Sequence, residues 1–374
     1  MGLINIRLGD YIKRSTENNS DLKYGEELIK GVNSSGVFAS PKGSTLEVDL
    51  KPYKIVNNEA FVYNPTRLNL GSLAYRTEGL CIVSHLYIIF YLTDEGKKII
   101  NPQWLYIYFH RNEFKREVTF RNFGSQRPEF NFNDMSDITV PLPDIKTQQK
   151  YVDVYNAMVA NQKAYERGLE DLKLTCDAYI DKLKNRCDAV PIGNYITQID
   201  HRNNENILYT FKGLSMENYF IDSVADSTGL NFSNYKIIAP GEYAAVLMKV
   251  GRDGRITIAR NDSKENFLIS PAYYSFKVDN INSNYFRANV NRLEFERRGW
   301  FACDTSARSS LTWTEFLKLS IPKANHKEQK VISNLYETLK SRNSINEKLK
   351  VQIKDICPIL IKGSIEEGRN TKEA

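Results

Sequence analysis

Cysteine, histidine and long apolar runs are scarce in this 374-residue sequence. The five cysteines form no C-x-x-C pair and the four histidines are widely separated, so neither a disulfide framework nor a metal site is predicted. The longest apolar stretch, 81–92, is too short to span a bilayer, and the first residues show no secretory signal pattern. We therefore expect a cytoplasmic protein that makes no contact with a membrane.

Catalytic motifs are missing as well. The sequence contains no G-x-G-x-x-G, P-loop, H-E-x-x-H or G-x-S-x-G pattern. Residues 143–146 resemble part of a nuclease motif, but they lack a second acidic partner, and we interpret them as the start of a helix. Residues 63–66 have one proline where the loop of an amino-methyltransferase has two. We therefore predict that this chain is not an enzyme.

A strong charge of one sign is also absent. The net charge is +6, from 51 basic and 45 acidic residues. Segment 1–145 holds 17 residues of each sign, and segment 188–325 holds 16 basic and 15 acidic residues. This balance neither requires nor excludes nucleic acid, so any specificity for DNA would depend on a few well-placed side chains.

Aromatic residues are plentiful, with 22 tyrosines and 18 phenylalanines, which is typical of short twisted strands. The sequence also repeats itself at a period near 182. Residues 8–12 return as 192–196, and the Ile-Thr-Val-Pro run at 138–141 returns as Leu-Ser-Ile-Pro at 319–322. Seven such matches occur in the same order, among them 58–59 with 241–242 and 149–150 with 329–330. Ordered matches with small insertions indicate a duplicated unit.

Each copy of the unit has a strand-rich module followed by a long helix without internal turns. We expect an α+β fold with two duplicated globular modules and two long helices. The predicted segments are a first module at 1–145, a first helix at 146–187, a second module at 188–325, a second helix at 326–364 and a polar tail at 365–374.

The long helices carry heptad spacing. In the first, apolar residues follow steps of four and three from Tyr165 through Leu169, Leu172, Cys176 and Tyr179 to Leu183. In the second, Leu335, Leu339 and Leu349 are spaced less strictly, and Pro358 is expected to end or kink the helix. Each such row of apolar residues forms a seam along one face of its helix. The simplest arrangement of two seams in one chain is that they pack against each other.

Two polar loops are candidates for reading bases. In the first module, the loop side chains are Asn64, Arg67 and Asn69, and in the second they are Lys249, Arg252 and Arg255. Arginine and lysine form paired hydrogen bonds with guanine, and asparagine does so with adenine. The alternative interpretation is a solvated hairpin tip.

A second pair of segments precedes the last strand of each module. Small hydroxyl side chains beside an arginine suit phosphate or base contacts. The alternative is a loop that caps a helix. The candidates are Arg121, Ser125, Gln126 and Arg127 in the first module and Arg308, Ser309 and Ser310 in the second.

The end of each module resembles a known family. An Ile-Thr-Val-Pro-Leu-Pro strand is followed by Gln148-Gln149-Lys150 and a heptad helix, and the pattern recurs as Leu-Ser-Ile-Pro with Glu328-Gln329-Lys330. This is similar to the specificity (S) subunit of Type I restriction-modification systems. The first copy reads Gln-Gln where the family usually has Glu-Gln, and the second lacks the second proline.

The resemblance implies two target-recognition domains, each reading half of a bipartite, asymmetric site in double-stranded DNA. It also implies that the helices form an antiparallel coiled coil, which sets the spacing between the domains. The implied partners are two methyltransferase subunits, which bind S-adenosylmethionine and methylate adenine, and a restriction subunit as a further component. No cofactor is expected on this chain. The alternatives are a coiled-coil scaffold whose modules bind other ligands, and an enzyme with an unrecognised site.

Overall fold

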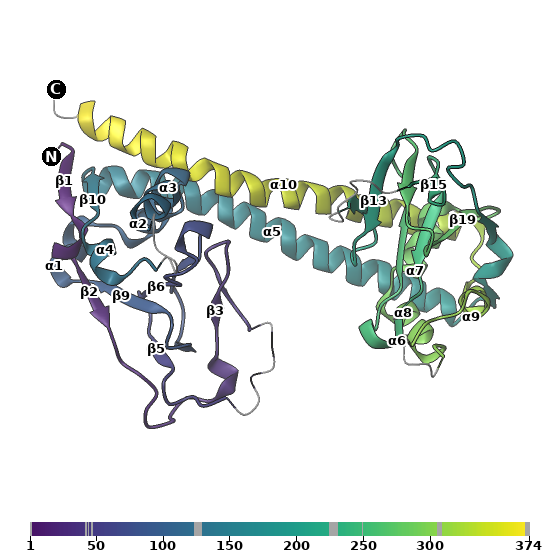
Figure 1. Cartoon of the computed structure of the whole chain (residues 1–374), viewed down its shortest axis with the longest axis horizontal. Helices are drawn as coiled ribbons and strands as arrows, with labels where there is room; N and C mark the ends of the chain where they lie inside the picture. Colours follow the sequence, from purple (N-terminus) through teal and green to yellow (C-terminus); the bar gives the residue numbers. More distant parts are fainter. Residues whose placement is uncertain are drawn as a thin grey trace. The chain divides into compact units, whose positions relative to one another are not determined.

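A computed structural model describes residues 2–41, 43, 45, 48–122, 129–223, 231–248, 250–304 and 309–370. The chain divides into two compact units. The first comprises Met1–Ala164 and Asn346–Ala374, and the second comprises Tyr165–Ile345. Each unit thus contains one strand-rich module and part of each of two long helices (Figure 1).

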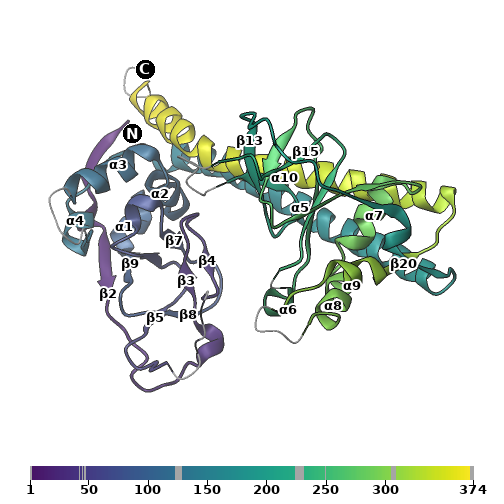
Figure 2. The same ribbon diagram turned by 45° about the vertical axis from the view of Figure 1, so that its right-hand side comes forward.

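The first module is built around a four-stranded antiparallel sheet with strand order β2-β9-β6-β7. The strands of the module are β1 (Ile4–Arg7), β2 (Ile12–Ser15), β3 (Gly31–Val32), β4 (Phe38–Ala39), β5 (Lys54–Val56), β6 (Phe61–Tyr63), β7 (Leu73–Tyr75), β8 (Cys81–Val83), β9 (Ile88–Leu92) and β10 (Thr139–Leu142). Its short helices are η1 (Leu8–Asp10), η2 (Glu26–Leu28), η3 (Leu68–Leu70), α1 (Asp94–Ile99), α2 (Pro102–Phe109), α3 (Asn112–Arg121) and α4 (Phe132–Ser136). Figure 2 shows β9 of this sheet next to α1.

The second module repeats this order as β12-β19-β16-β17. Its strands are β11 (Ala189–Pro191), β12 (Ile196–Ile199), β13 (Thr210–Leu214), β14 (Phe220–Asp222), β15 (Lys236–Ile238), β16 (Tyr243–Val246), β17 (Thr257–Arg260), β18 (Phe267–Ile269), β19 (Tyr274–Val278) and β20 (Ser320–Pro322). Its short helices are η4 (Ile192–Tyr195), α6 (Val250–Asp253), α7 (Ser283–Val290), α8 (Leu293–Phe301) and α9 (Trp313–Lys318). The predicted duplicated α+β fold is confirmed by this shared sheet order.

Equivalent side chains stabilise both modules. An asparagine caps one helix after each sheet: Asn101 accepts hydrogen bonds at the start of α2 and Asn282 does so at the start of α7. Phe61 stacks on Phe90 with ring centroids 5.0 Å apart, and Tyr243 stacks on Phe276 at 5.3 Å. Each stacked pair joins the two central strands of its sheet, so the cores follow one plan.

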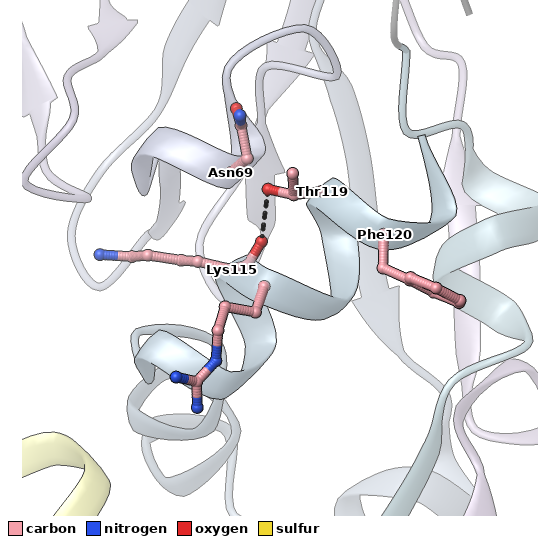
Figure 3. A pocket seen from close by; sticks show the side chains of 5 residues that line it. Asn69, Lys115, Thr119 and Phe120 are labelled. Atoms are coloured by element: carbon pink, nitrogen blue, oxygen red, sulfur yellow. Dashed lines mark hydrogen bonds between the residues drawn. The ribbon is translucent and has the colours of Figure 1, made fainter. Parts of the chain in front are cut away.

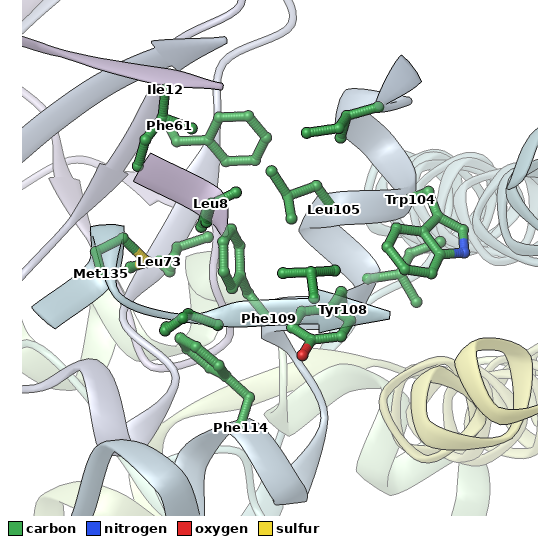
Figure 4. Close-up of a cluster of buried hydrophobic side chains, with 14 of the residues drawn as sticks. Leu8, Ile12, Phe61, Leu73, Trp104, Leu105, Tyr108, Phe109, Phe114 and Met135 are labelled. Carbon is green, nitrogen blue, oxygen red and sulfur yellow. The ribbon is translucent and has the colours of Figure 1, made fainter. Parts of the chain in front are cut away.

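In the first module, helix α2 covers the sheet with its apolar side chains. Figure 4 shows Leu105 and Phe109 pointing from α2 toward Phe61, and the Phe61 and Phe109 ring centroids are 6.1 Å apart. Trp104 is fully buried, and its indole N–H donates to Ser364 Oγ at 3.0 Å. The bond joins the module to the second long helix within the same unit.

Helix α2 is followed by its C-cap residue His110, a half-buried histidine that gives this unit a pH-dependent stability. Its Nδ1 lies 2.8 Å from the carbonyl oxygen of Tyr106, and Nε2 has no hydrogen-bond partner among the described residues. Burial lowers the pKa of His110 to about 4, and the charges of Lys115 and Lys354 act in the same direction. The native state therefore favours the neutral imidazole.

We expect the first unit to lose stability as the pH falls from about 6.5 to about 4, because the unfolded state then binds a proton that the native histidine rejects. His110 costs no stability above about pH 6.5, where the histidine is neutral in both the native and the unfolded state. The stability lost because of His110 reaches about 3 kcal/mol near pH 4. Urea unfolding at several pH values measures it. The variant His110→Asn keeps a donor for Tyr106 and should flatten this part of the profile; an unchanged profile would contradict the assignment.

The long helices are α5 (Ile145–Lys184) and α10 (His326–Asn370), and they pack antiparallel within each unit. In the first unit, Lys150 contacts Glu367 at 2.8 Å and Gln162 contacts Asn346 at 3.0 Å. In the second unit, Arg186 contacts Glu328 at 2.9 Å. As residue numbers rise along α5, the numbers of the residues that they contact on α10 fall. This confirms the antiparallel pairing expected of the family.

The residues of the predicted seam are unequally buried. Leu183 is fully buried. The half-buried members are Leu169, Leu172, Leu335, Leu339 and Leu349. A two-helix pair with no third helix over it leaves such positions partly open to solvent.

Helix α10 continues through Pro358, so of the two expectations for this residue, an end or a kink, the first is wrong. It continues to Asn370 and takes in six residues, 365–370, that were assigned to a polar tail. Proline removes one backbone hydrogen bond, at a cost of about 3 kcal/mol. Cys357 and Ile361 on the same turns are buried in the core of the first module, and Ile365 packs against it, so tertiary packing outweighs the local cost.

The two copies are more alike at the start of their long helices than the sequence alignment suggested. Gln148 accepts a hydrogen bond from the backbone N–H of Asn101 at 2.7 Å, and Gln329 accepts one from the backbone N–H of Asn282 at 2.9 Å. Gln329 therefore corresponds to Gln148 rather than to Gln149. The family's Glu-Gln pair consequently reads Thr147-Gln148 in the first copy. In that copy the Thr147 hydroxyl donates to Asp144 at 2.8 Å. In the second copy, Glu328 at the same position forms a capping box with Asn325.

A second correction concerns the turn before β6 and β16. Glu59 has φ +65° and Gly241 has φ +86°, so these two residues occupy the same left-handed position. The alignment had placed Glu59 opposite Glu242. Sequence matching favoured the shared glutamate, whereas the backbone conformation identifies glycine as its counterpart.

A polar pair is buried between α5 and α10. The side-chain amide of Gln162 donates to Asn346 Oδ1, and Asn346 is almost completely buried. Polar residues in a helix seam fix the register of the pairing at a cost in stability.

We expect Asn346→Leu to lower the free energy of unfolding of the first unit by about 1–2 kcal/mol, because the buried amide of Gln162 loses this partner. The double variant Gln162→Leu/Asn346→Leu should recover the loss, since two apolar side chains fill the seam. Urea unfolding of all four chains forms the double-mutant cycle. A double variant as unstable as the sum of the single variants would show that the two side chains do not act as a pair.

Candidate nucleic-acid interface

In the first module, the polar loop follows β6 and is shaped by its own residues. The backbone N–H and hydroxyl of Thr66 donate to Asn64 Oδ1 at 3.1 and 2.8 Å. Leu68 is buried, and η3 ends at Gly71, whose φ of +97° favours glycine. A Cβ at Gly71 would lie 2.7 Å from a backbone oxygen of Ser34. The loop is therefore well defined.

Anchoring Leu68 turns the loop's polar side chains outward. Arg67 and Asn69 are exposed, and Asn64 is half-buried because it holds the turn. Asn64 thus acts mainly in shaping the loop, whereas Arg67 and Asn69 are free to meet a ligand.

The second module has α6 at the equivalent position after β16. The backbone N–H of Leu311 donates to Leu247 at 2.9 Å, as that of Phe130 donates to Pro65 at 3.0 Å. Val250 is fully buried and Gly254 has φ +67°, which parallels Leu68 and Gly71 in the first module. The two predicted loops therefore occupy corresponding positions in the repeat.

Arg252 and Arg255 are both exposed on this second loop. Arg252 forms two hydrogen bonds to the carboxylate of Asp253, at 2.6 and 3.1 Å, which fixes its guanidinium. Within the described part of the chain, Arg255 makes one hydrogen bond, to the carbonyl oxygen of Met216 at 3.4 Å. Of the two, Arg255 is the less committed to a partner in the chain. Lys249 lies outside the described residues.

Helix α3 packs against η3 and extends the surface of the first loop. Asn69, Lys115, Arg116, Thr119 and Phe120 line a shallow hollow of about 400 Å³ (Figure 3). Burial and the charge of Lys354 lower the pKa of Lys115. The hollow combines an amide, two cationic side chains and an exposed aromatic ring, which are groups that bind nucleic acids.

Helix α8 lies beside the second loop in the same way. The indole N–H of Trp300 donates to the carbonyl oxygen of Gly251 at 2.8 Å. A Cβ at Gly299 would lie 2.2 Å from Ile256, so the helix approaches the loop closely because this residue is glycine. Helix α3 therefore supports the first loop and helix α8 supports the second. Both helices have the same place in their modules, two elements before the last strand.

The second pair of predicted segments is only partly described. Arg121 is the last residue of α3, and its guanidinium contacts Glu117 at 2.8 Å. Ser309 has φ +43°, and its carbonyl oxygen accepts from the backbone N–H of Gly251 at 2.8 Å, which brings Ser309 and Ser310 next to the second loop. Ser125, Gln126, Arg127 and Arg308 lie outside the described residues.

Groups suited to catalysis are not gathered in the part of the chain that is described. Within those residues, no cluster of three or more histidine, cysteine or acidic side chains could hold a metal ion. Burial raises the pKa of the Cys176 and Cys357 thiols to about 11, so neither is an activated nucleophile. Over the same residues, no helix is both long and apolar enough to cross a membrane.

Comparison with known proteins places these features in a family context. Residues 3–171 match the family model described as "Type I restriction modification DNA specificity domain". None of the curated proteins searched matches the chain. A solved structure of the S subunit of a Type-I restriction-modification system from M. genitalium is 10% identical, with a TM-score of 0.54 and coverage of 98% of this chain and 96% of that one. This likeness shows a common fold.

Two further solved structures align over similar lengths. An HsdS subunit from Thermoanaerobacter tengcongensis is 15% identical, with a TM-score of 0.38 and coverage of 97% of this chain and 96% of that one. A structure described as concerning complex assembly and conformational transition of the type I R-M system is 14% identical, with a TM-score of 0.48 and coverage of 97% of both chains.

Proposed function

We propose that this chain, whose residues 3–171 match the family model of the Type I restriction modification DNA specificity domain, recognises a bipartite, asymmetric site in double-stranded DNA. In this proposal it is the specificity subunit that carries two methyltransferase subunits, and a restriction subunit where one is present, to that site. The partners bind S-adenosylmethionine and perform adenine methylation or cleavage, and the complex acts in the cytoplasm. This chain itself performs no chemistry.

One observation carries the proposal: the two modules place different polar side chains at corresponding loops. The first presents Arg67 and Asn69 after β6, and the second presents Arg252 and Arg255 near α6. Arginine favours guanine and asparagine favours adenine in the major groove. Two equivalent loops with different residues are suited to reading two different half-sites.

The long helices support the proposed assembly. At about 1.5 Å per residue, each helix is roughly 60 Å long or more, enough to set a fixed spacing between half-sites. Their surfaces also carry apolar side chains that the helix pair leaves exposed: Val154, Leu174, Val351 and Ile359. Exposed apolar side chains along a helix favour docking of another protein, and a methyltransferase subunit is the proposed occupant.

The test is DNA binding by the purified chain at low salt, with and without a Type I methyltransferase subunit. We expect sequence-specific binding of duplex DNA only when the methyltransferase subunit is present, since the modules alone are nearly neutral. Methylation or cleavage by the chain alone would identify it as an enzyme instead. Absence of DNA binding under every partner condition would favour a protein scaffold.

A further inference from the structure

An arginine and a phenylalanine recur together on one helical face in both modules. Arg116 and Phe120 lie on α3, and Arg297 and Phe301 lie on α8, at the same spacing of four residues. Residues four apart are neighbours on a helix surface. Since both pairs are separated by 181 residues along the sequence, each pair is the counterpart of the other in the repeat.

Both phenylalanine rings are left in water. Phe120 is 81% exposed and Phe301 is 86% exposed. Each helix is held to its module by other residues, through Phe114 and Val118 in α3 and through Phe295 in α8, all of them buried. Full burial of such a ring stabilises a protein by about 2 kcal/mol, and neither ring contributes this to its own module.

The exposed rings adjoin the recognition loops. In the first module, Phe120, Arg116 and the loop residue Asn69 line one hollow (Figure 3). In the second, Trp300, which precedes Phe301, is hydrogen-bonded to Gly251 beside Arg252. Phe120 therefore lies beside the first loop, and Phe301 directly follows the residue that is hydrogen-bonded to the second loop.

The charge of these faces suits a polyanion. Among the residues that the structure describes, the ion pair of Arg116 is a solvent-exposed contact of 3.4 Å with Glu113, a type of pair worth less than about 1 kcal/mol, so a phosphate can replace the carboxylate. Arg297 forms no ion pair with any described residue. A cation about one helical turn from an exposed apolar ring is the combination with which proteins grip the backbone and enter a base step.

Resting on the proposed function, we propose that Phe120 and Phe301 are wedges that partly unstack a base step beside each half-site, while Arg116 and Arg297 bind adjacent phosphates. Each module then recognises its half-site in two ways: the loop contacts base edges, and the wedge favours a step that unstacks easily. Sequence preference thereby extends to positions that no loop residue touches.

The test uses the full chain assembled with its methyltransferase subunits on its own DNA site. 2-Aminopurine, whose fluorescence rises when it is unstacked, replaces in turn each base within and next to the two half-sites except the adenines to be methylated, which a methyltransferase flips out of the stack by itself. We expect the unaltered complex to raise the fluorescence at one step beside each half-site. Phe120→Ala should abolish the rise at one half-site only and weaken binding about 10-fold, and Phe301→Ala should do the same at the other.

Two further variants make the result specific. Phe120→Trp should retain the rise, because it keeps a large aromatic ring. Leu86→Ala removes another exposed apolar side chain, from the turn between β8 and β9, and should change neither the fluorescence nor the affinity.

The outcomes separate this inference from the proposed function. Specific DNA binding without any fluorescence rise, or a rise that persists in both alanine variants, overturns the wedge and leaves the recognition function intact. Loss of the methyltransferase subunits from the Phe120→Ala complex would instead identify the rings as protein contacts and also overturn it. Failure of the unaltered complex to bind any specific DNA would overturn the recognition function itself.

Discussion

Replacing Gln148 with alanine should lower the free energy of unfolding of the first unit by about 4 kcal/mol. Gln148 is fully buried at the start of α5. Its side-chain oxygen accepts from the Asn101 backbone N–H at 2.7 Å, and its amide donates to the carbonyl oxygens of Ile99 and Pro143 at 2.8 and 2.7 Å. The variant leaves these three backbone groups without that partner, and each unsatisfied buried group costs about 1–3 kcal/mol.

Gln149→Ala is the matched control because it changes the adjacent residue of the same type. The Gln149 side chain is exposed, and its hydrogen bonds go to the side chains of Asp153 and Asn101. Its removal should cost less than about 1 kcal/mol, since water replaces both partners. Urea unfolding, together with hydrogen exchange of the α2 amides, distinguishes the two variants. Equal losses in both would contradict the role assigned to Gln148.

The second copy provides a graded comparison. Gln329 is half-buried, and its bonds go to the Asn282 backbone N–H and the carbonyl oxygen of Ala324. Gln329→Ala should therefore destabilise the second unit by about 2 kcal/mol, less than Gln148→Ala destabilises the first.

Exchanging single loop residues should alter one half-site at a time. We expect Asn69→Ala to weaken discrimination at one half-site and Arg255→Ala at the other, each by about 1–3 kcal/mol, or roughly 5- to 150-fold, because a paired contact to a base is lost. Both side chains are exposed, so the fold should be unaffected. Competition binding of the assembled complex with duplexes altered in one half-site measures the effect.

Lys98→Ala is the control for loss of a positive charge. Lys98 is an exposed residue of α1 that contacts Glu95 and belongs to neither loop. It should leave discrimination at both half-sites unchanged. If Asn69→Ala and Arg255→Ala weaken binding to all duplexes uniformly, these residues contact phosphates rather than bases, and the assignment of one loop to each half-site is wrong.

The duplicated architecture could be predicted from the sequence because strand patterns, turns and helix starts recur in order. Its detailed register could not. Gln148 and Gln149 are adjacent and identical, so pattern matching cannot choose between them, whereas burial and hydrogen bonding select Gln148. Likewise, Glu59 has a left-handed backbone conformation. A glycine suggests this conformation in the second copy, at Gly241, but a glutamate does not suggest it in the first.

Local rules failed where tertiary contacts decide. Pro358 is a helix-breaking residue by its own chemistry, but the buried neighbours Cys357 and Ile361 hold α10 helical to Asn370. The exposed rings of Phe120 and Phe301 were missed for the opposite reason, because a phenylalanine in a helical pattern is expected to face the core. The spacing of 181 residues between the Arg116–Phe120 and Arg297–Phe301 pairs was the available signal.

The central claim is that this chain specifies a DNA site in two parts, one for each module. The most direct measurement is sequencing of methylated adenines in cells with and without the gene for this chain, in the presence of the methyltransferase subunit. We expect methylation that depends on the gene and falls within an asymmetric motif of two short specific parts separated by a fixed, unspecified spacer. Methylation that is unchanged without the gene, or that follows one continuous motif, would contradict the claim.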